Sequence, residues 1–260
     1  MKNAKKNKGK NVNLAVYFTV IVIFIILVSV VFKGLDIVRK SKFDGENRFT
    51  VAVVSDNNID YISVSPKEGT LTRLNVRGVN EDDIDILPIP RDALVIANSE
   101  TIGNPKTYFL KMILGKKTER SDLTIIDLIK LSIYSQGVKH EKILNKRVLG
   151  TSEDISRAAD VDFIDPEIAG EKVSIQITNT TKISGLGNKL AKYIANMGGN
   201  VVLVNSSSDP QGKSKILYRE ESYTLGRLAG FLDIPKEKNE ANPISDIIII
   251  IGEDRIEFFK

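Results

Sequence analysis

The 260-residue chain contains no cysteine and a single histidine. Without cysteine, disulfides, zinc–thiolate sites and thiol nucleophiles are excluded. A multi-histidine metal site is also excluded, and any histidine-based catalytic triad would depend on His140 alone. This residue lies between Lys139 and Glu141, so we expect an exposed, solvated side chain rather than a catalytic base.

Basic charge is scarce outside two short segments. Residues 1–13 carry five lysines and no acid, and residues 33–42 contribute a further +3, so the formal charge of +4 leaves −4 for residues 43–260. Nucleic acid selects basic surfaces, so we expect no nucleic-acid partner. The chain is 42% hydrophobic and 27% charged, which is typical of a folded protein.

A long uncharged segment covers residues 14–32. As a helix at about 1.5 Å per residue, it matches a hydrocarbon core of about 30 Å. A cleaved signal peptide is the alternative, but the apolar run is long for one and no small-residue cleavage site follows. We therefore expect a single-pass anchor with no transport pathway. Flanking bases nearly cancel the positive-inside signal, and we favour a cytoplasmic tail at 1–13 and an extracytoplasmic C-terminal part.

After the anchor, a charged juxtamembrane stalk at 33–48 leads to an α/β domain at 49–160. Runs rich in β-branched and aromatic residues predict a β-meander, with strands at 49–55, 60–65 and 70–76.

An acidic loop and residues 86–96 follow the meander. Two prolines there predict an edge or irregular first half of a strand. Helical periodicity then predicts one helix from Pro105 and another after an N-cap at Ser121. We place the domain boundary at about 155–171.

The C-terminal domain, residues 171–255, has the clearest pattern. It predicts strands at 173–178, 201–204, 215–218 and 246–251, with helices at 190–197 and 221–232. This βαββαβ order is that of ferredoxin-like split folds, and the whole chain is predicted to be α/β (α+β) with a C-terminal βαββαβ sandwich. Five consecutive isoleucines at 247–251 predict a central, covered strand.

Three motifs have both a functional and a structural interpretation. Gly185 and Gly187 lie where a phosphate-binding loop would, but Leu190 occupies the third glycine position, so we favour a structural turn. The acids at 81–85 could hold a hard cation, and we favour a solvated loop. Arg91 and Asp92 could bind phosphate and Mg²⁺, and the alternative is a surface pair at a strand end.

Several motifs in the C-terminal domain occur together in order. They are Ile177–Thr181, Gly185–Gly187 leading into Leu190–Ile194, Gly198–Val201 with Asn205, Ile216–Tyr218, Leu228–Ala229 and Asp246–Asp254. By these motifs, residues 173–254 resemble the C-terminal domain of LytR-CpsA-Psr proteins.

The middle domain resembles, more faintly, the start of the catalytic domain of that family, through residues 60–67 and the stretch IPRDALV at 89–95. The family domain transfers glycopolymers from a polyprenyl-pyrophosphate carrier to the cell wall, using arginines and Mg²⁺-binding aspartates. In this chain about ten more residues than in the family separate the strand at 60–65 from Pro90. The paired arginines that occur later in the family domain are not found, and residues 100–165 are too few to form the remainder of that domain. The resemblance therefore implies a degenerate relative, in which Arg91 and Asp92 are the candidate catalytic residues.

The leading hypothesis is a single-pass cell-envelope protein whose extracytoplasmic ectodomain is non-catalytic, uses no cofactor and binds a wall polymer or an envelope protein. The alternative is a Mg²⁺-dependent phosphotransferase that attaches glycopolymers to the cell wall. A second alternative is an envelope-linked regulator, although the charge and the lack of a basic recognition helix argue against direct DNA binding.

Overall fold

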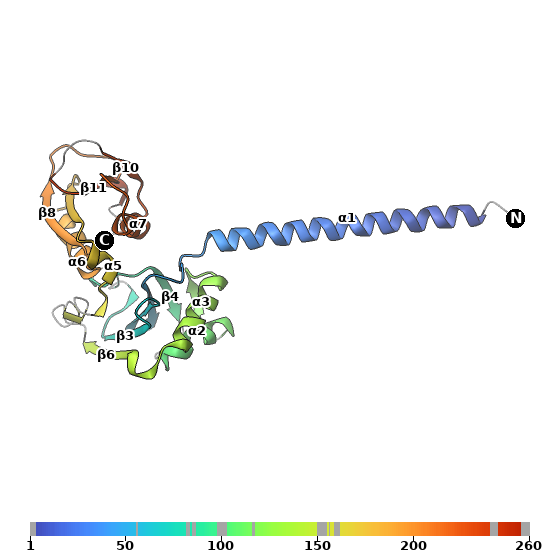
Figure 1. Cartoon of the computed structure of the whole chain (residues 1–260), viewed down its shortest axis with the longest axis horizontal. Coiled ribbons are helices and arrows are strands. Elements are labelled where there is room, and N and C mark those ends of the chain that lie inside the picture. The colour runs from blue at the N-terminus through green and yellow to red at the C-terminus, as the bar shows by residue number, and fades with distance from the viewer. Residues whose placement is uncertain are drawn as a thin grey trace.

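The computed structural model describes residues 4–55, 57–81, 84, 87–97, 103–115, 118–149, 155, 157–158, 162–239 and 244–255. It shows a mixed α/β protein in which a long N-terminal helix projects from two units, each built on one mixed sheet (Figure 1). The α/β fold class predicted from the sequence is confirmed.

The N-terminal helix α1 (Ala4–Arg39) contains the predicted apolar segment. Its stretch Val16–Asp36 is long and apolar enough to cross a membrane, and no part of it is buried against the rest of the chain. The helix fits a single-pass membrane anchor by length and composition. It continues to Arg39, so the first part of the expected stalk is helical.

The segment after α1 packs against the middle domain instead of standing free. Ser41 Oγ and the Phe43 amide both donate to Asp127 Oδ1, at 2.7 and 2.9 Å. The Phe43 side chain is 1% exposed and belongs to the middle-domain core. Lys130 Nζ donates to the Phe43 carbonyl at 2.8 Å. The anchor helix is therefore joined to the domain through a short, hydrogen-bonded connection.

The middle sheet has the strand order β5-β4-β1-β2-β3-β6. Its strands are β1 (Phe49–Ser55), β2 (Asn58–Ser65), β3 (Thr70–Arg77), β4 (Ala93–Ala97), β5 (Thr118–Ser121) and β6 (Ile143–Leu149). The first three are antiparallel neighbours, so the predicted meander is confirmed. β4 pairs parallel to β1, and β6 pairs parallel to β3.

Both faces of this sheet are covered. Helices α2 (Pro105–Ile113) and α3 (Ile125–Gly137) pack on one face, where Phe109, Leu128 and Leu131 meet inward-facing residues of β1 to β4. The other face is covered by apolar residues from the segments around 79–89 and 155–163. Burial on both faces explains why the apolar run of β1 is continuous rather than alternating.

The structure differs from the sequence-based predictions at several points of this domain. The helix predicted after Ser121 begins at Ile125, because Thr124 is the N-cap and forms a capping box with Asp127. Ser121 instead ends β5, a strand that the sequence did not predict, and β6 is a second strand without a sequence prediction. Of the predicted strand at 86–96, the described residues before Ala93 are not in a strand.

The C-terminal sheet has the strand order β10-β9-β11-β7-β8. Its elements are a short helix α5 (Pro166–Glu171), β7 (Ser174–Asn179), α6 (Leu186–Asn196), β8 (Asn200–Ser206), β9 (Lys215–Tyr218), α7 (Tyr223–Leu232), β10 (Lys236–Lys238) and β11 (Ile247–Ile251). β7 and β8 are direct parallel neighbours, whereas a split fold places another strand between them. The expected split arrangement is therefore wrong, and β10 is an additional strand.

The isoleucine strand β11 is central, as predicted, between β9 and β7. Ile247, Ile249 and Ile251 are buried under α6 and α7, but Ile248 and Ile250 on the opposite face are only half-buried. The expectation of a covered strand is thus met on one face alone, because both long helices of this domain pack on the same side of the sheet.

Candidate functional site

The predicted pair Arg91 and Asp92 lies just before β4, and its two side chains do not form a common site. Asp92 Oδ2 accepts the Thr50 amide at 2.8 Å, and Asp92 Oδ1 lies 3.1 Å from Arg227 Nη1 on α7. Arg91 Nη1 instead donates to the Ile84 carbonyl at 3.4 Å. Asp92 therefore joins the two domains, and the partner that it meets was missed from the sequence because Arg227 lies in another domain.

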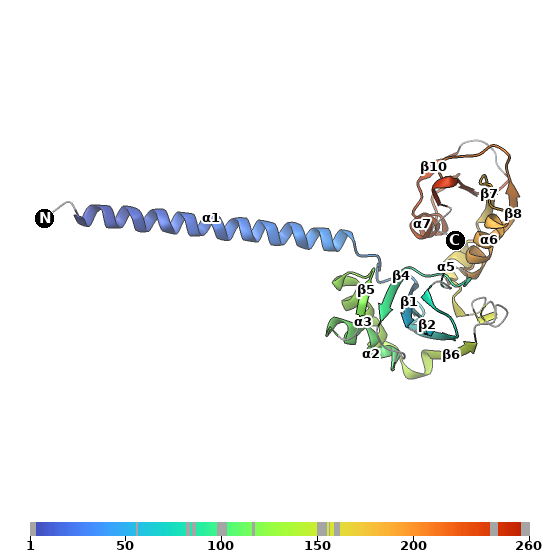
Figure 2. The same cartoon turned by 180° about the vertical axis from the view of Figure 1, so that it is seen from behind.

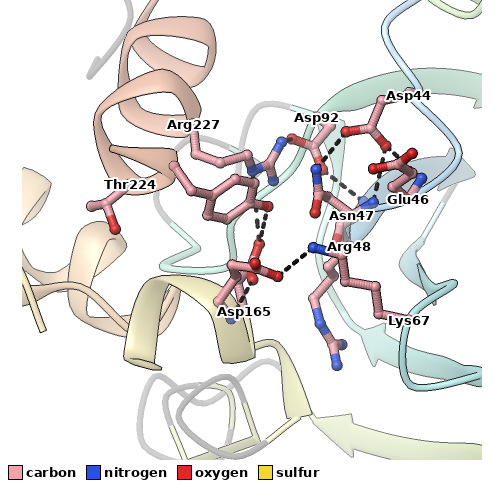
Figure 3. Close-up of polar contacts among 12 residues, drawn as sticks. Asp44, Glu46, Asn47, Arg48, Lys67, Asp92, Asp165, Thr224 and Arg227 are labelled. Atoms are coloured by element: carbon pink, nitrogen blue, oxygen red, sulfur yellow. Dashed lines mark hydrogen bonds and ion pairs between the residues drawn. The ribbon is translucent and has the colours of Figure 1, made fainter. Parts of the chain in front are cut away.

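Around this ion pair, Asp92, Asp165, Tyr223 and Arg227 form an interdomain cluster, most of which Figure 3 labels. Asp165 Oδ2 accepts the Tyr223 hydroxyl at 2.7 Å and lies 3.8 Å from Arg227 Nε. Burial and the hydrogen bond to Asp165 raise the pKa of Tyr223. Burial lowers the pKa of Arg227, but Asp92, Tyr223 and Asp165 together outweigh burial and the pKa is raised overall. Both side chains are therefore fixed in their protonated states.

Two further polar contacts connect the domains. Lys67 forms an ion pair with Glu167 on α5, and Asn196 on α6 donates to the Pro88 carbonyl. The two domains are consequently joined by side chains from the start of β4, the β2–β3 turn and three C-terminal helices.

The remaining sequence candidates do not converge on a site. Gly187 lies where an added Cβ would be 3.0 Å from Val204 Cγ1, so it permits close contact between α6 and β8. Glu81 is exposed and lies 3.7 Å from Arg120, and the acids at 82, 83 and 85 lie outside the described residues. Over the described ranges, no cluster of three or more acids or histidines is arranged to hold a metal ion.

A basic groove is present on the middle domain instead. It has a volume of about 810 Å³ and is lined by Arg73, Gly103–Lys106, His140, Ile143 and Asn145–Arg147. These residues come from β3, from the N-terminus of α2 and from β6 with the turn before it. His140 is exposed, as predicted, but its position in a groove was not predicted.

A buried ion pair lies under the groove. Arg73 Nε donates to Asp60 Oδ1 at 2.7 Å, and the Asp60 side chain is 0% exposed. Burial raises the pKa of Asp60, and Arg73 opposes this shift only in part. The pKa of the Tyr108 hydroxyl on α2 is raised, first by burial and second by the negative charge of the nearby Asp60. The guanidinium of Arg73 is thereby held at the floor of the groove.

The other groove cations differ in their partners. Lys146 Nζ lies 2.7 Å from Asp162 Oδ2, and Lys106 Nζ donates to the Val138 carbonyl at 2.6 Å. Arg147 is exposed on the edge strand β6. No acidic residue is among the described residues that line the groove. Such an arrangement can accept several anionic oxygens through charge-assisted hydrogen bonds.

An apolar N-terminal helix followed by two joined α/β domains defines a two-domain protein that fits attachment to a membrane by a single span. Residues 172–254 match the family described as LytR cell envelope-related transcriptional attenuator. This match confirms that the C-terminal domain resembles that of LytR-type proteins. The match does not extend into the middle domain.

Other comparisons add little. No curated protein matches the chain. Among solved structures, the Lin1025 protein from Listeria innocua is 12% identical over 82% of this chain and 94% of that chain, with a TM-score of 0.18, which supports no conclusion about fold or function.

Proposed function

We propose that this protein is a single-pass cell-envelope protein with an extracytoplasmic ectodomain that binds an anionic envelope polymer in the basic groove. The observation that carries the proposal is the groove itself, which gathers Arg73, Lys106, His140, Lys146 and Arg147 without a lining acid. The ligand class is a polymer that carries phosphate or carboxylate groups along its length.

The charge distribution supports this ligand class. Residues 43–260 carry a net charge of −4, and against this background a groove with several cations and no acid among its described lining residues favours an anionic ligand. Arginine offers planar paired donors that match phosphate and carboxylate oxygens, and lysine adds a point charge. The groove is open and follows an edge strand, which suits an extended polymer better than an enclosed small molecule.

The surroundings of Asp92 favour binding over Mg²⁺-dependent transfer. Mg²⁺ requires several oxygen ligands, but one carboxylate oxygen of Asp92 accepts a backbone amide and the other faces the Arg227 guanidinium. A positive charge at 3.1 Å opposes the binding of a second cation. The residues present do not fit the metal, and Arg91 and Asp92 are better explained as structural residues.

The test measures binding of the full-length protein, in nanodiscs of neutral phosphatidylcholine, to fluorescent inorganic polyphosphate by anisotropy. Parallel arms use poly-glutamate, neutral dextran and duplex DNA. The groove variant combines Lys106→Gln and Arg147→Gln, and the matched control combines Lys182→Gln and Lys238→Gln, which removes the same charge from exposed C-terminal positions. We expect the groove variant to bind polyphosphate at least about tenfold more weakly, the loss of roughly one charge-assisted contact.

Each outcome has a defined meaning. Tighter binding of polyphosphate or poly-glutamate than of dextran, weakened by salt and by the groove variant alone, supports the proposal. Equal losses in the groove and control variants would show nonspecific charge attraction and overturn it. Tighter binding of DNA than of the other polymers would favour the hypothesis of an envelope-linked regulator. Mg²⁺-dependent binding of a polyprenyl-pyrophosphate analogue that is lost in Arg91→Ala would favour the transferase.

A further inference from the structure

Helix α3 exposes an apolar stripe beside the anchor. Ile125, Ile129 and Ile133 recur every four residues and are 45%, 45% and 65% exposed. This spacing places them along one side of the helix, while Leu128 and Leu131 on the other side are buried in the core. We call these three isoleucines the α3 stripe. Single exposed aliphatic residues are ordinary, but a row of three on one helix indicates a surface that contacts something apolar.

The α3 stripe belongs to the part of the ectodomain that lies nearest the anchor. The apolar span of α1 ends at Asp36, and Ser41 is hydrogen-bonded to Asp127 in the first turn of α3. Five residues at about 3.6 Å each cover at most roughly 18 Å, and the first three of these residues are still helical and therefore shorter. Both views also show α2 and α3 on the side of the middle domain that is turned towards α1 (Figures 1 and 2).

This position brings α3 to the polar surface of a bilayer that α1 spans. The polar headgroup zone adds about 5–8 Å beyond each side of the hydrocarbon core. An ordinary helix tilt of about 20° brings one side of the attached domain closer still. The connection through Asp127 and the buried Phe43 keeps α3 from moving away on a loose tether.

The charges around the α3 stripe match a lipid surface. Arg39, Lys40 and Lys42 lie between the span and α3, where Lys40 is paired with the exposed Asp36 and Lys42 lies 3.9 Å from Asp122. Basic residues at this depth attract anionic headgroups, and aliphatic residues at the same level insert at the boundary with the acyl chains. An apolar stripe bordered by bases is the usual composition of an interfacial helix.

We propose that the α3 stripe rests on the bilayer in which α1 is anchored, so that the ectodomain is held against the membrane surface by two contacts. The occupant of this surface is lipid, and the orientation of the basic groove relative to the membrane is thereby fixed. The inference rests on anchoring by α1, and it does not depend on what the groove binds.

The absence of native cysteine makes the test direct, because single cysteines can be labelled without background. Full-length protein carrying an NBD fluorophore at Ile129→Cys is placed in nanodiscs, with one copy per disc, that contain lipids with a nitroxide quencher near the headgroup. Phe24→Cys within α1 reports insertion of the anchor. Val202→Cys, an exposed aliphatic position on β8, is the matched control.

We expect a blue shift and lipid-dependent quenching at 129 and neither effect at 202. In a second protein, Ile125→Gln and Ile133→Gln are added, and the signal at 129 should move towards that of 202. Blue-shifted emission at 24 without quenching at 129 would overturn the proposal while leaving the anchor intact, whereas emission at 24 like that at 202 would overturn the anchor. A blue shift at 129 only in discs that hold several copies would assign the α3 stripe to a second chain.

Discussion

At the scale of single residues, the Asp127 carboxylate accepts four hydrogen bonds. The donors are the Phe43 amide, the Ser41 hydroxyl and both the amide and the hydroxyl of Thr124, at 2.7 to 2.9 Å. One side chain thus closes the capping box of α3 and holds the segment that leads to the membrane helix. The N-cap was predicted at Ser121 rather than at Thr124. The sequence also contains nothing that pairs Asp127 with residues 41–43.

The Asp127 carboxylate should make stability depend on acid pH. Burial raises its pKa, but the hydrogen bonds from Phe43, Ser41 and Thr124 outweigh burial and lower the pKa overall. A group whose pKa is lowered on folding stabilises the fold fully above its unfolded pKa of about 4, and this contribution is lost as the pH falls through the folded value. We expect Asp127→Asn to lower the free energy of unfolding by about 2–3 kcal/mol at neutral pH. The decrease of that free energy at acid pH should be smaller in the variant than in the wild type.

Urea unfolding in detergent, followed by circular dichroism between pH 3 and pH 7, would measure this effect. Asp209→Asn, in an exposed loop of the C-terminal domain, is the control and should leave the acid profile unchanged. If the free energies of unfolding of the wild type and Asp127→Asn differed by the same amount at every pH, the ionised carboxylate would not be the stabilising group.

At the scale of elements, the sequence predicts those strands and helices whose own side chains are buried or capped. The β-branched runs of β1, β2 and β3 and the amphipathic face of α6 are visible because core burial selects apolar residues at the local period. β5 and β6 were missed because both are edge strands, and β6 is mostly exposed and carries Asn145, Lys146 and Arg147. Their strand conformation depends on pairing with distant neighbours.

Dependence on distant neighbours also explains why the groove and the interdomain cluster were not predicted from the sequence. Arg73 lies on β3, Lys106 on α2 and Arg147 on β6, and no short spacing relates them. Asp92 was found as a polar residue of possible interest, but its partner Arg227 is brought to it only by the packing of α7 against the middle domain. The sequence therefore identified individual polar residues of interest, but not which of them the fold brings together in space.

The one-sided burial of β11 gives a test within one strand. Ile249→Asp places a carboxylate among the apolar residues under α6 and α7, and should lower the free energy of unfolding by about 4 kcal/mol or more. Ile248→Asp places the same group on the half-buried face and should cost clearly less. Thermal unfolding of both variants provides the comparison, and equal costs would show that both faces of the strand are covered.

At the scale of the whole molecule, contacts run from α1 through the middle domain to the C-terminal domain. The first junction is made by Asp127 and Phe43, and the second by the interdomain cluster and the contacts of Lys67 and Asn196. Each junction has a buried or half-buried polar core rather than a loose linker. The position of the C-terminal domain relative to the membrane therefore depends on both.

The second junction should fail when Arg227 is removed. Arg227→Ala removes the ion-pair partner of Asp92 and a cation beside Asp165, so the domains should lose their fixed arrangement while each keeps its own core. Arg219→Ala, an exposed arginine of the same domain, is the matched control. Nitroxides on single cysteines introduced at Lys139 and Lys238, one in each domain, report the distance between the domains by pulsed electron paramagnetic resonance.

We expect a narrow distance distribution in the wild type and in Arg219→Ala, and a broad one in Arg227→Ala. A double-mutant cycle with Asp92→Asn, followed by urea unfolding, should give a coupling of roughly 1–3 kcal/mol between the two side chains. The cluster is half-buried, so added salt should weaken this coupling less than it weakens exposed ion pairs. A distribution that stays narrow in Arg227→Ala would mean that Lys67, Asn196 and the apolar contacts hold the domains together without the cluster.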